Sequence, residues 1–413
     1  MATAFKDETT FTDPLDVSRA ELYTNHLWHE PFARLRAEAP VYWCEDSKFG
    51  SYWSVSSHKA IQYVESLPDI YSSDWQNGGI TIVDRDEMEN DIQLPMFIAM
   101  DRPKHTDQRR TVAPAFTPSE MVRIATEIRT RTAETLDTLP WGETFDWVDR
   151  VSIELTTGML AILFDFPWAD RRKLTFWSDW AGDIELAADH TRRDERMMIL
   201  YEMGGYFQKL WDERVNKEPT PDLISMMIHS ESMKNMDQME FMGNLILLIV
   251  GGNDTTRNTM SGIAYSLNKY PEQRALLEND PGLIPNAASE FIRWQTPLAH
   301  MRRTALEDTV LDGKAIKKGD KVILWYISAN RDESVFPDAE SLILKRENAR
   351  RHLSFGYGIH RCVGARLAEL QVQILLEEMA KRRMRVNVIG DPVRVSQCFV
   401  NGYRKMDVTL SKY

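Results

Sequence analysis

Apolar residues recur at helical spacing through most of the chain and follow strand-like patterns in only a few short segments. Amphipathic helices are predicted over residues 118–136 and 151–164, where apolar positions fall on one helical face. A β-hairpin is predicted where residues 41–45 and 51–55 flank a turn containing Gly50. Further elements are predicted as helices at residues 31–39 and 363–381 and as a strand at residues 322–327. The pattern indicates a mainly α-helical protein with small β-sheets.

The strongest helical signal covers residues 237–269. Asp237 and Glu240 resemble a capping box at its start, and Pro271 follows its end. Residues 245–250 are apolar on every side of this helix. The helix is therefore predicted to run through the interior of the molecule.

Polar and small residues occupy the centre of this helix, at Gly251, Gly252, Asp254 and Thr255. Each glycine inside a helix costs about 1 kcal/mol relative to alanine. A buried carboxylate costs more unless it is paired. A helix broken at its own centre indicates a functional site. The alternative is a packing kink with a capped aspartate.

Length, cysteine count and charge narrow the class of protein. At about 150 residues per domain, 413 residues would suggest two or three domains. Three cysteines exclude a disulfide scaffold and fit a reducing cytoplasm. The net charge of −12 argues against a nucleic-acid binder. No signal peptide is recognisable, and the longest apolar run, residues 245–250, is too short to span a membrane, so a cytoplasmic protein without stable membrane insertion is expected.

A glycine-rich segment at residues 355–364 places Cys362 at the N-terminus of the predicted helix 363–381. Unpaired backbone N–H groups at a helix N-terminus favour a thiolate. A nucleophilic cysteine would need a base, and His360 is only two residues away. A zinc site would need further ligands at short spacing, which Cys44 and Cys398 do not supply. An axial thiolate to haem iron fits best, and a buried structural cysteine is the remaining alternative.

The pattern Phe355-x-x-Gly358-x-His360-x-Cys362-x-Gly364 resembles the haem-binding loop of the cytochrome P450 superfamily. Three more segments match motifs of that family in the same order, and these are the oxygen-activation motif at residues 251–256, the ExxR motif at residues 290–293 and the stretch from residue 330 to Arg346. The resemblance covers nearly the whole chain. It implies one P450 domain over residues 1–413, mainly α-helical with small sheets, around a buried haem, which overrides the estimate from length.

The resemblance implies roles for individual residues. Cys362 would be the axial ligand of haem b, iron protoporphyrin IX, with Phe355, Gly358 and Gly364 around the sulfur. Asp254 and Thr255 would be the catalytic acid–alcohol pair. The haem propionates would be held by His105, Arg109, Arg303 and His360, with Arg302 as the alternative to Arg303. Glu290, Arg293 and Arg346 would form a structural network that supports the haem loop.

Two electrons per turnover are needed, and the sequence has no dinucleotide-binding motif, P-loop or iron–sulfur cysteine cluster. A separate ferredoxin, served by an NAD(P)H-dependent reductase, is therefore expected. A local basic cluster would suit docking of an acidic partner. Its members would be Lys104, Arg109, Arg110, Arg361 and Arg366.

By resemblance, the substrate pocket combines the access loop at residues 72–100 with Leu247, Val250, Gly251, Leu298 and Phe399. Residues 145–154 and 248–258 look most like the bacterial soluble alkane-hydroxylase branch. This implies insertion of one oxygen atom of O2 into a terminal C–H bond of a medium-chain alkane or fatty acid. The alternatives are a terpene, sterol or aromatic substrate, a non-catalytic haem-thiolate sensor, a haem-thiolate dehydratase or peroxygenase, and a cysteine hydrolase without haem.

Overall fold

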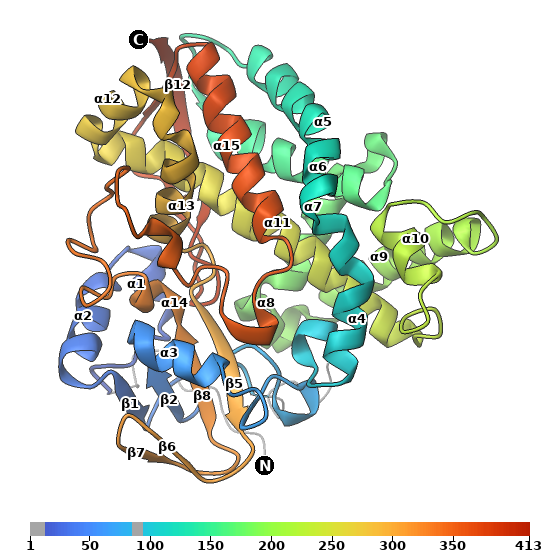
Figure 1. The fold of residues 1–413 in the computed structure, drawn as a ribbon, viewed down its shortest axis with the longest axis vertical. Coiled ribbons are helices and arrows are strands. Elements are labelled where there is room, and N and C mark those ends of the chain that lie inside the picture. The colour runs from blue at the N-terminus through green and yellow to red at the C-terminus, as the bar shows by residue number, and fades with distance from the viewer. Residues whose placement is uncertain (1–12, 85–93) are drawn as a thin grey trace.

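The computed structural model describes residues 13–84 and 94–413 (Figure 1). The helices are α1 Ala20–Thr24, α2 His29–Glu38, α3 His58–Glu65, α4 Lys104–Val112, α5 Pro118–Asp137, α6 Glu154–Phe164, α7 Arg172–Gly182, α8 Ile184–Ala188, α9 Arg193–Arg214, α10 Leu223–Ile228, α11 Gln238–Lys269, α12 Pro271–Asn279, α13 Ile284–Gln295, α14 Tyr326–Ala329 and α15 Ala365–Lys381. The strands are β1 Val41–Cys44, β2 Tyr52–Val55, β3 Tyr71–Ser72, β4 Phe145–Asp146, β5 His300–Ala305, β6 Thr309–Leu311, β7 Lys314–Ile316, β8 Lys321–Trp325, β9 Met384–Val388, β10 Val393–Arg394, β11 Tyr403–Lys405 and β12 Asp407–Lys412.

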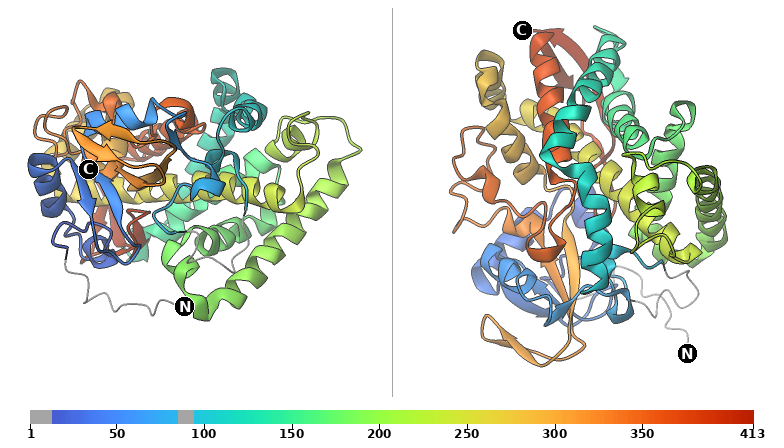
Figure 2. Two further views of the ribbon diagram at one scale, coloured as in Figure 1. Left: turned by 90° about the horizontal axis from the view of Figure 1, so that it is seen from below. Right: turned by 45° about the vertical axis from the view of Figure 1, so that its right-hand side comes forward.

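The molecule is mainly helical, as predicted, and its largest sheet has the strand order β1-β2-β8-β5-β3. Helix α11 crosses the middle of the fold and contacts α6, α7, α13 and α15 (Figures 1 and 2). The sheet lies to one side of α11, whereas α9 and α10 lie on the other. None of the described helices is both long and apolar enough to cross a lipid bilayer.

Helix α11 confirms the strongest prediction and corrects its central feature. The Asp237 carboxylate accepts a hydrogen bond from the backbone N–H of Glu240 at 2.9 Å, and Pro271 begins α12. The predicted break at Gly251 and Gly252 is wrong, because α11 is continuous. A Cβ atom on Gly252 would lie 2.7 Å from Leu160 Cδ2, so this glycine allows close packing of α11 on α6.

Other predicted elements differ from the structure mainly at their ends. The hairpin is confirmed, with Val41 paired to Val55 in antiparallel register. The predicted strand 322–327 is wrong at its end, because β8 stops at Trp325 and the chain turns into α14. Helix α15 starts two residues later than predicted, after the N-cap Gly364. A π-helix at Val148–Ile153 precedes α6, which begins at Glu154.

Candidate active site

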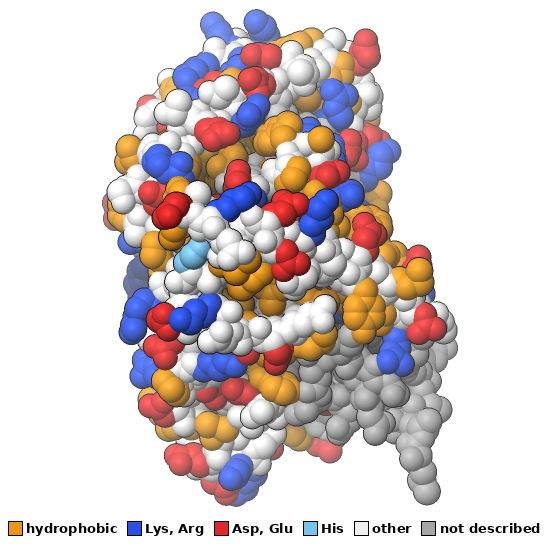
Figure 3. Space-filling view, turned by 90° about the vertical axis from the view of Figure 1, so that its right-hand side faces the viewer, with side chains coloured by type: hydrophobic (Ala, Val, Ile, Leu, Met, Phe, Trp, Pro, Cys, Tyr) orange, Lys and Arg blue, Asp and Glu red, His pale blue; other side chains and the backbone are white. Residues whose placement is uncertain are grey.

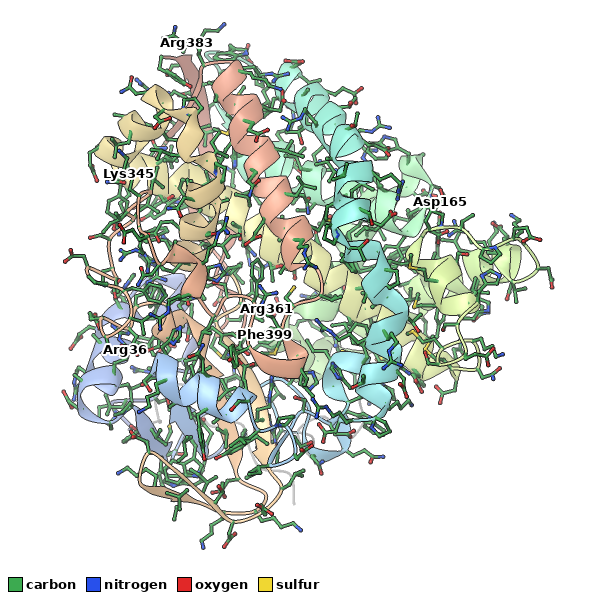
Figure 4. All side chains as sticks on the ribbon, viewed as in Figure 1. Arg36, Asp165, Lys345, Arg361, Arg383 and Phe399 are labelled. Atoms are coloured by element: carbon green, nitrogen blue, oxygen red, sulfur yellow. The ribbon has the colours of Figure 1, made fainter. Side chains whose placement is uncertain are left out.

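Residues 355–364 form a tight loop that immediately precedes α15 in the chain (Figures 1 and 4). The backbone N–H of Cys362 donates to the carbonyl oxygen of Phe355 at 2.8 Å, which closes the loop. Gly358 has a φ of +66°, and a Cβ atom there would overlap the carbonyl oxygen of Glu65. A Cβ atom on Gly364 would lie 4.0 Å from Cys362 Sγ. The glycines therefore bring the loop backbone close to its neighbours and leave the sulfur uncrowded.

Cys362 combines an exposed side chain with densely packed surroundings. Burial by the surrounding protein raises the pKa of its thiol, whereas the backbone N–H of Gly364 and the cations Arg109 and Arg361 oppose this shift. A thiol that is accessible and yet largely enclosed by protein lines an internal surface. A metal cation bound to the sulfur would supply the charge that stabilises a thiolate there.

The middle of α11 also presents accessible surface inside the molecule. Gly251 is exposed, and a Cβ atom there would meet no described atom within 4 Å. Thr255, one turn later on the same face, is half-buried and donates its hydroxyl to the carbonyl oxygen of Gly251 at 2.9 Å. α11 contacts α15, the helix that follows the cysteine loop. The acid–alcohol motif therefore lies on a helix that packs against the helix following the cysteine motif.

Four of the predicted propionate partners form one cationic cluster. The rings of His105, in α4, and His360 lie 4.2 Å apart between centroids, and Arg109 and Arg303 act electrostatically on the His360 ring. Arg109 Nη2 donates to the carbonyl oxygen of Arg361, which ties α4 to the cysteine loop. The structure therefore assembles His105, Arg109, Arg303 and His360 from three distant segments.

The ring nitrogens of His105 and His360 are all buried, and they make no hydrogen bond to any described residue. Burial, reinforced by Arg109 and Arg102, lowers the pKa of His105 to about 4. Burial and the neighbouring Arg303 lower the pKa of His360 far below its usual value. Buried donors without acceptors cost free energy. A ligand with two carboxylates would satisfy these donors and offset the positive charge, so the residues present fit the propionates of haem.

Arg302 and Arg303 are adjacent on β5 but contact different partners. These contacts distinguish the two candidates for a propionate-binding residue. Arg302 Nη1 donates to Asp84 Oδ1 at 3.0 Å and to the carbonyl oxygen of Val83 at 3.2 Å. It therefore holds the described N-terminal part of the access loop. Arg303 Nη2 donates to Glu65 Oε1 at 3.1 Å and lies beside His360. Arg303 is the member of the pair that belongs to the cationic cluster.

The Glu290 side chain forms the centre of a closed network. Its carboxylate accepts from Arg293 Nε and Nη2, each at 2.8 Å, and from Arg346 Nε at 3.1 Å. The backbone N–H of Ile343 donates to it at 2.9 Å. Both Glu290 and Arg293 have fully buried side chains. The predicted contacts of this triad are therefore present, and they tie α13 to the segment before the cysteine loop.

Asp254 lies in a second paired group, on the side of α11 that faces α7. Its Oδ1 atom lies 3.0 Å from Arg257 Nη2 and accepts from Ser178 Oγ at 3.1 Å. Arg257 Nη1 also donates to Asp179 Oδ1 at 2.8 Å, and the Asp179 side chain is 52% exposed. Burial raises the pKa of Asp254, and Arg257 opposes the rise. The i,i+3 spacing could have revealed Arg257, but no sequence signal indicated Ser178 or Asp179.

The predicted substrate residues divide between two apolar clusters. Leu247 and Val250 pack on the helical core around α11, and Val250 Cγ1 would lie 3.0 Å from a Cβ atom on Gly182. Leu298 and Phe399 belong to a cluster on the sheet side that also contains Ile184. Phe399 is buried with its ring against His300, whereas Leu298 is half-buried. Residues 85–93 of the predicted access loop lie outside the described residues.

The predicted docking residues are mostly exposed. Arg361, labelled in Figure 4, and Arg366 are exposed near the start of α15, and Arg110 is 76% exposed. Lys104 is also exposed, and its Nζ atom pairs with Glu240 Oε2 at 2.7 Å, which helps to join α4 to α11. On the face in Figure 3, basic and acidic side chains are interspersed, with hydrophobic side chains between them. A docking surface would therefore depend on a few exposed arginines, such as Arg110, Arg361 and Arg366, and not on a broad basic face.

Comparison with known proteins supports the family assignment. The family model described as Cytochrome P450 matches residues 283–383. Linalool 8-monooxygenase of Pseudomonas putida is 36% identical over 96% of this chain and 98% of its own length. Methyl-branched lipid omega-hydroxylase of Mycobacterium tuberculosis is 34% identical over 92% of this chain and 90% of its own.

A solved structure agrees with these relatives. CYP153D17 from Sphingomonas sp. PAMC 26605 is 68% identical, with a TM-score of 0.92 over 97% of this chain and 100% of that chain. The shared fold and the similarity along nearly the full length agree with the order of the sequence motifs. The chain therefore belongs to the cytochrome P450 family and is a monooxygenase of the haem-thiolate type.

Proposed function

We propose that this monooxygenase hydroxylates the terminal carbon of medium-chain alkanes or fatty acids, using O2 and electrons from a separate ferredoxin with its NAD(P)H-dependent reductase. The accessible but enclosed thiol of Cys362, beside the unsatisfied donors of His105 and His360, is the observation that carries the chemistry. The substrate class is supported by the likeness of residues 145–154 and 248–258 to alkane hydroxylases. One relative is a methyl-branched lipid omega-hydroxylase, whose name also refers to the end of a chain.

This chain would hold haem b at two places, the iron and the propionates. Cys362 would provide the axial thiolate, while Phe355, Gly358 and Gly364 shape the loop around the sulfur. The cationic cluster of His105, Arg109, Arg303 and His360 would bind the propionates. When bound, the haem supplies oxygen activation and C–H oxidation, which thiolate ligation promotes. The protein that encloses Cys362 raises the pKa of its thiol, which increases the need for a positive charge beside the sulfur.

Protons would reach the site through the group around Asp254. Asp179 is exposed and pairs with Arg257, which stays protonated and also pairs with the buried Asp254, so the Asp254 carboxyl itself would carry the proton. The raised pKa of Asp254 makes its carboxyl a better proton carrier near neutral pH. Thr255 holds its hydroxyl on the Gly251 carbonyl oxygen, where it would hold a proton at the edge of the open space beside Gly251. Asp254 would thus move the proton and Thr255 would position it.

Electron transfer would occur on the cysteine side of the molecule. Arg110, Arg361 and Arg366 are exposed around α4 and the start of α15. An acidic ferredoxin would be attracted to these cations even though the whole chain carries a net charge of −12. Lys104 is less available for docking, since it already pairs with Glu240.

The haem site is tested by the spectrum of the reduced protein with carbon monoxide. We expect the red-shifted Soret band of thiolate ligation in the wild type and its loss in Cys362→Ser. Cys44→Ser is the matched control, because Cys44 is buried in the β1–β2 hairpin away from the loop. A purified protein without haem, or a Cys362→Ser variant with the wild-type spectrum, would contradict the assignment.

The substrate class is tested by product analysis with linear alkanes and fatty acids, using the reconstituted ferredoxin system. We expect 1-alkanols or ω-hydroxy acids from the wild type. Gly251→Ala should move hydroxylation toward inner carbons, because the added methyl group enters accessible space beside Thr255. Gly205→Ala on α9 adds a methyl group in equally open space and should leave the products unchanged. Identical product ratios in all three proteins would show that Gly251 does not shape the substrate pocket.

A terpene substrate is the second candidate, favoured by the similarity to linalool 8-monooxygenase over 96% of the chain. Binding of substrate shifts the haem spectrum when it displaces a ligand of the iron. Titrations with octane, lauric acid and linalool would therefore rank the classes directly. A larger shift at lower concentration with linalool would favour the terpene.

A further inference from the structure

Glu65, the last residue of α3, is a buried carboxylate that the roles described above do not use. Its side chain is 1% exposed. Oε1 accepts from the Tyr326 hydroxyl at 2.6 Å and from Arg303 Nη2 at 3.1 Å. Oε2 is buried and has no hydrogen bond of good geometry to any described residue. Glu65 therefore relies on one cation, whereas Glu290 contacts two arginines.

The cysteine loop runs directly over Glu65. A Cβ atom on Gly356 would lie 3.4 Å from both Glu65 Oε1 and the Tyr326 hydroxyl oxygen. A Cβ atom on Gly358 would overlap the Glu65 carbonyl oxygen. Both glycines have a φ of +66°. The end of α3 thus supports the loop that carries His360 and Cys362.

Arg303 links Glu65 to the proposed haem site. Its Nη2 atom donates to Glu65, while its charge acts on His360 and His105. A haem propionate bound to Arg303 would share this guanidinium with the Glu65 carboxylate. Two carboxylates that share one buried cation cannot both be fully compensated, so protonation of one is favoured.

We propose that Glu65 is a proton-binding site coupled through Arg303 to the haem, and that it takes up a proton when the iron is reduced. The proposal rests on the haem position given under the proposed function. The electron comes from the ferredoxin and converts ferric to ferrous iron. The proton comes from solvent and forms an O–H bond on the Glu65 carboxylate, so the added negative charge is balanced by one positive charge. Glu65 is thus a positioning residue that acts through Arg303.

Among the described groups in this region, Glu65 is the one that titrates near neutral pH. Burial raises its pKa to about 7, although Arg303, the Tyr326 hydroxyl and the Tyr357 backbone N–H oppose the rise. The Tyr326 hydroxyl has a pKa well above its usual value because it is buried. Beyond Arg303, His105 and His360 have lowered pKa values and stay neutral, and Arg102 and Arg109 contribute to lowering both.

The sign of the pH effect follows from the charge. Reduction adds a negative charge to the haem, which raises the pKa of Glu65 in the ferrous protein above its value in the ferric protein. Between these two pKa values, reduction is accompanied by proton uptake. The midpoint potential therefore falls as the pH rises through this window and is flat on either side. A tenfold change in proton concentration shifts the potential by at most about 59 mV.

The experiment is a redox titration of the haem-loaded protein from pH 5.5 to 9, without hydrocarbon substrate. We expect the wild-type potential to fall with rising pH above neutrality. Glu65→Gln keeps the size of the side chain and mimics the protonated state. Its potential should be independent of pH and should equal the low-pH plateau of the wild type. Glu333→Gln, at a carboxylate that is 60% exposed, should keep the wild-type slope.

Tyr326→Phe provides a second, independent variant. It removes one hydrogen bond to the ionised carboxylate, so the pKa of Glu65 should rise and the window should move to higher pH. A flat wild-type profile, an unchanged slope in Glu65→Gln, or an unshifted window in Tyr326→Phe would overturn the proposal. Because no substrate is present, a wrong substrate class leaves the result unaffected, whereas a wrong haem site shows as loss of the thiolate spectrum.

Discussion

Two buried charged clusters lie close to the cysteine loop, and they differ in how fully their members are paired. In the cluster of Glu290, Arg293 and Arg346, each carboxylate oxygen accepts from both arginines. Arg293 Nη1 also donates to the carbonyl oxygens of Asn330 and Ala339, each at 2.7 Å. Arg346 Nη2 donates likewise to the carbonyl oxygens of Asp338 and Ser341, so the carboxylate and both guanidinium groups have hydrogen-bond partners within the chain, and the cluster needs no ligand.

The cluster of His105, His360, Arg109 and Arg303 is the opposite case. Its histidine nitrogens are buried without partners among the described residues, and Glu65 is the carboxylate that pairs with Arg303. Unpaired buried donors and an excess of positive charge destabilise a protein unless a ligand completes them. Pairing therefore distinguishes a structural cluster from a binding site, although both contain a buried arginine.

The largest effect is expected for the closed cluster. Glu290→Gln leaves two buried guanidinium groups without their carboxylate, so the free energy of unfolding should fall by about 3–5 kcal/mol. Chemical denaturation would measure this. Glu333→Gln removes an exposed carboxylate whose buried partner Arg36 keeps Glu340 Oε1 and Ser328 Oγ as neighbours, so it should cost less than about 1 kcal/mol. Equal effects of the two substitutions would remove the distinction between the clusters.

A smaller effect, on cofactor binding, is expected for the open cluster. Arg303→Gln removes a charged donor to a propionate, worth about 1.5–3 kcal/mol, so haem should bind about 10- to 100-fold more weakly. Arg302→Gln is the matched control, because Arg302 contacts Asp84 instead. Haem transfer to an excess of apomyoglobin would measure both rates of loss. Faster loss from Arg302→Gln would reverse the assignment.

The smallest effect is expected for His105→Phe, which should stabilise the haem-free protein but weaken the binding of haem. His105→Phe replaces unsatisfied buried nitrogens by carbon in a ring of similar shape. The haem-free protein should become more stable by about 1 kcal/mol, while haem retention should weaken. Denaturation with and without haem would test this. A loss of stability in the haem-free form would show that His105 is already satisfied within the chain.

Much of the fold and site followed from local patterns. The apolar period predicted α11, α5 and the β1–β2 hairpin, because these elements depend on residues close together in the chain. The cysteine loop and the acid–alcohol pair were recognisable because each forms a short motif. The i,i+4 spacing of His105 and Arg109 likewise predicted that both side chains would face the same site.

Tertiary packing determined what local patterns could not. Local patterns did not predict that α11 continues through Gly251 and Gly252, where Leu160 of α6 packs against Gly252. The choice of Arg303 over Arg302 depends on which side of β5 each faces, toward Glu65 or toward Asp84. Glu65 carries no motif, since its importance arises from segments 238 and 261 residues away in sequence.

The sequence by itself thus determined the family, the ligand cysteine proposed for the iron and the residue types around it, because these are written in contiguous motifs. Only the tertiary structure decided which charges are paired and which remain open. The reason is physical: hydrogen bonds and ion pairs between distant segments depend on distances of a few ångströms, and no spacing along the chain specifies them.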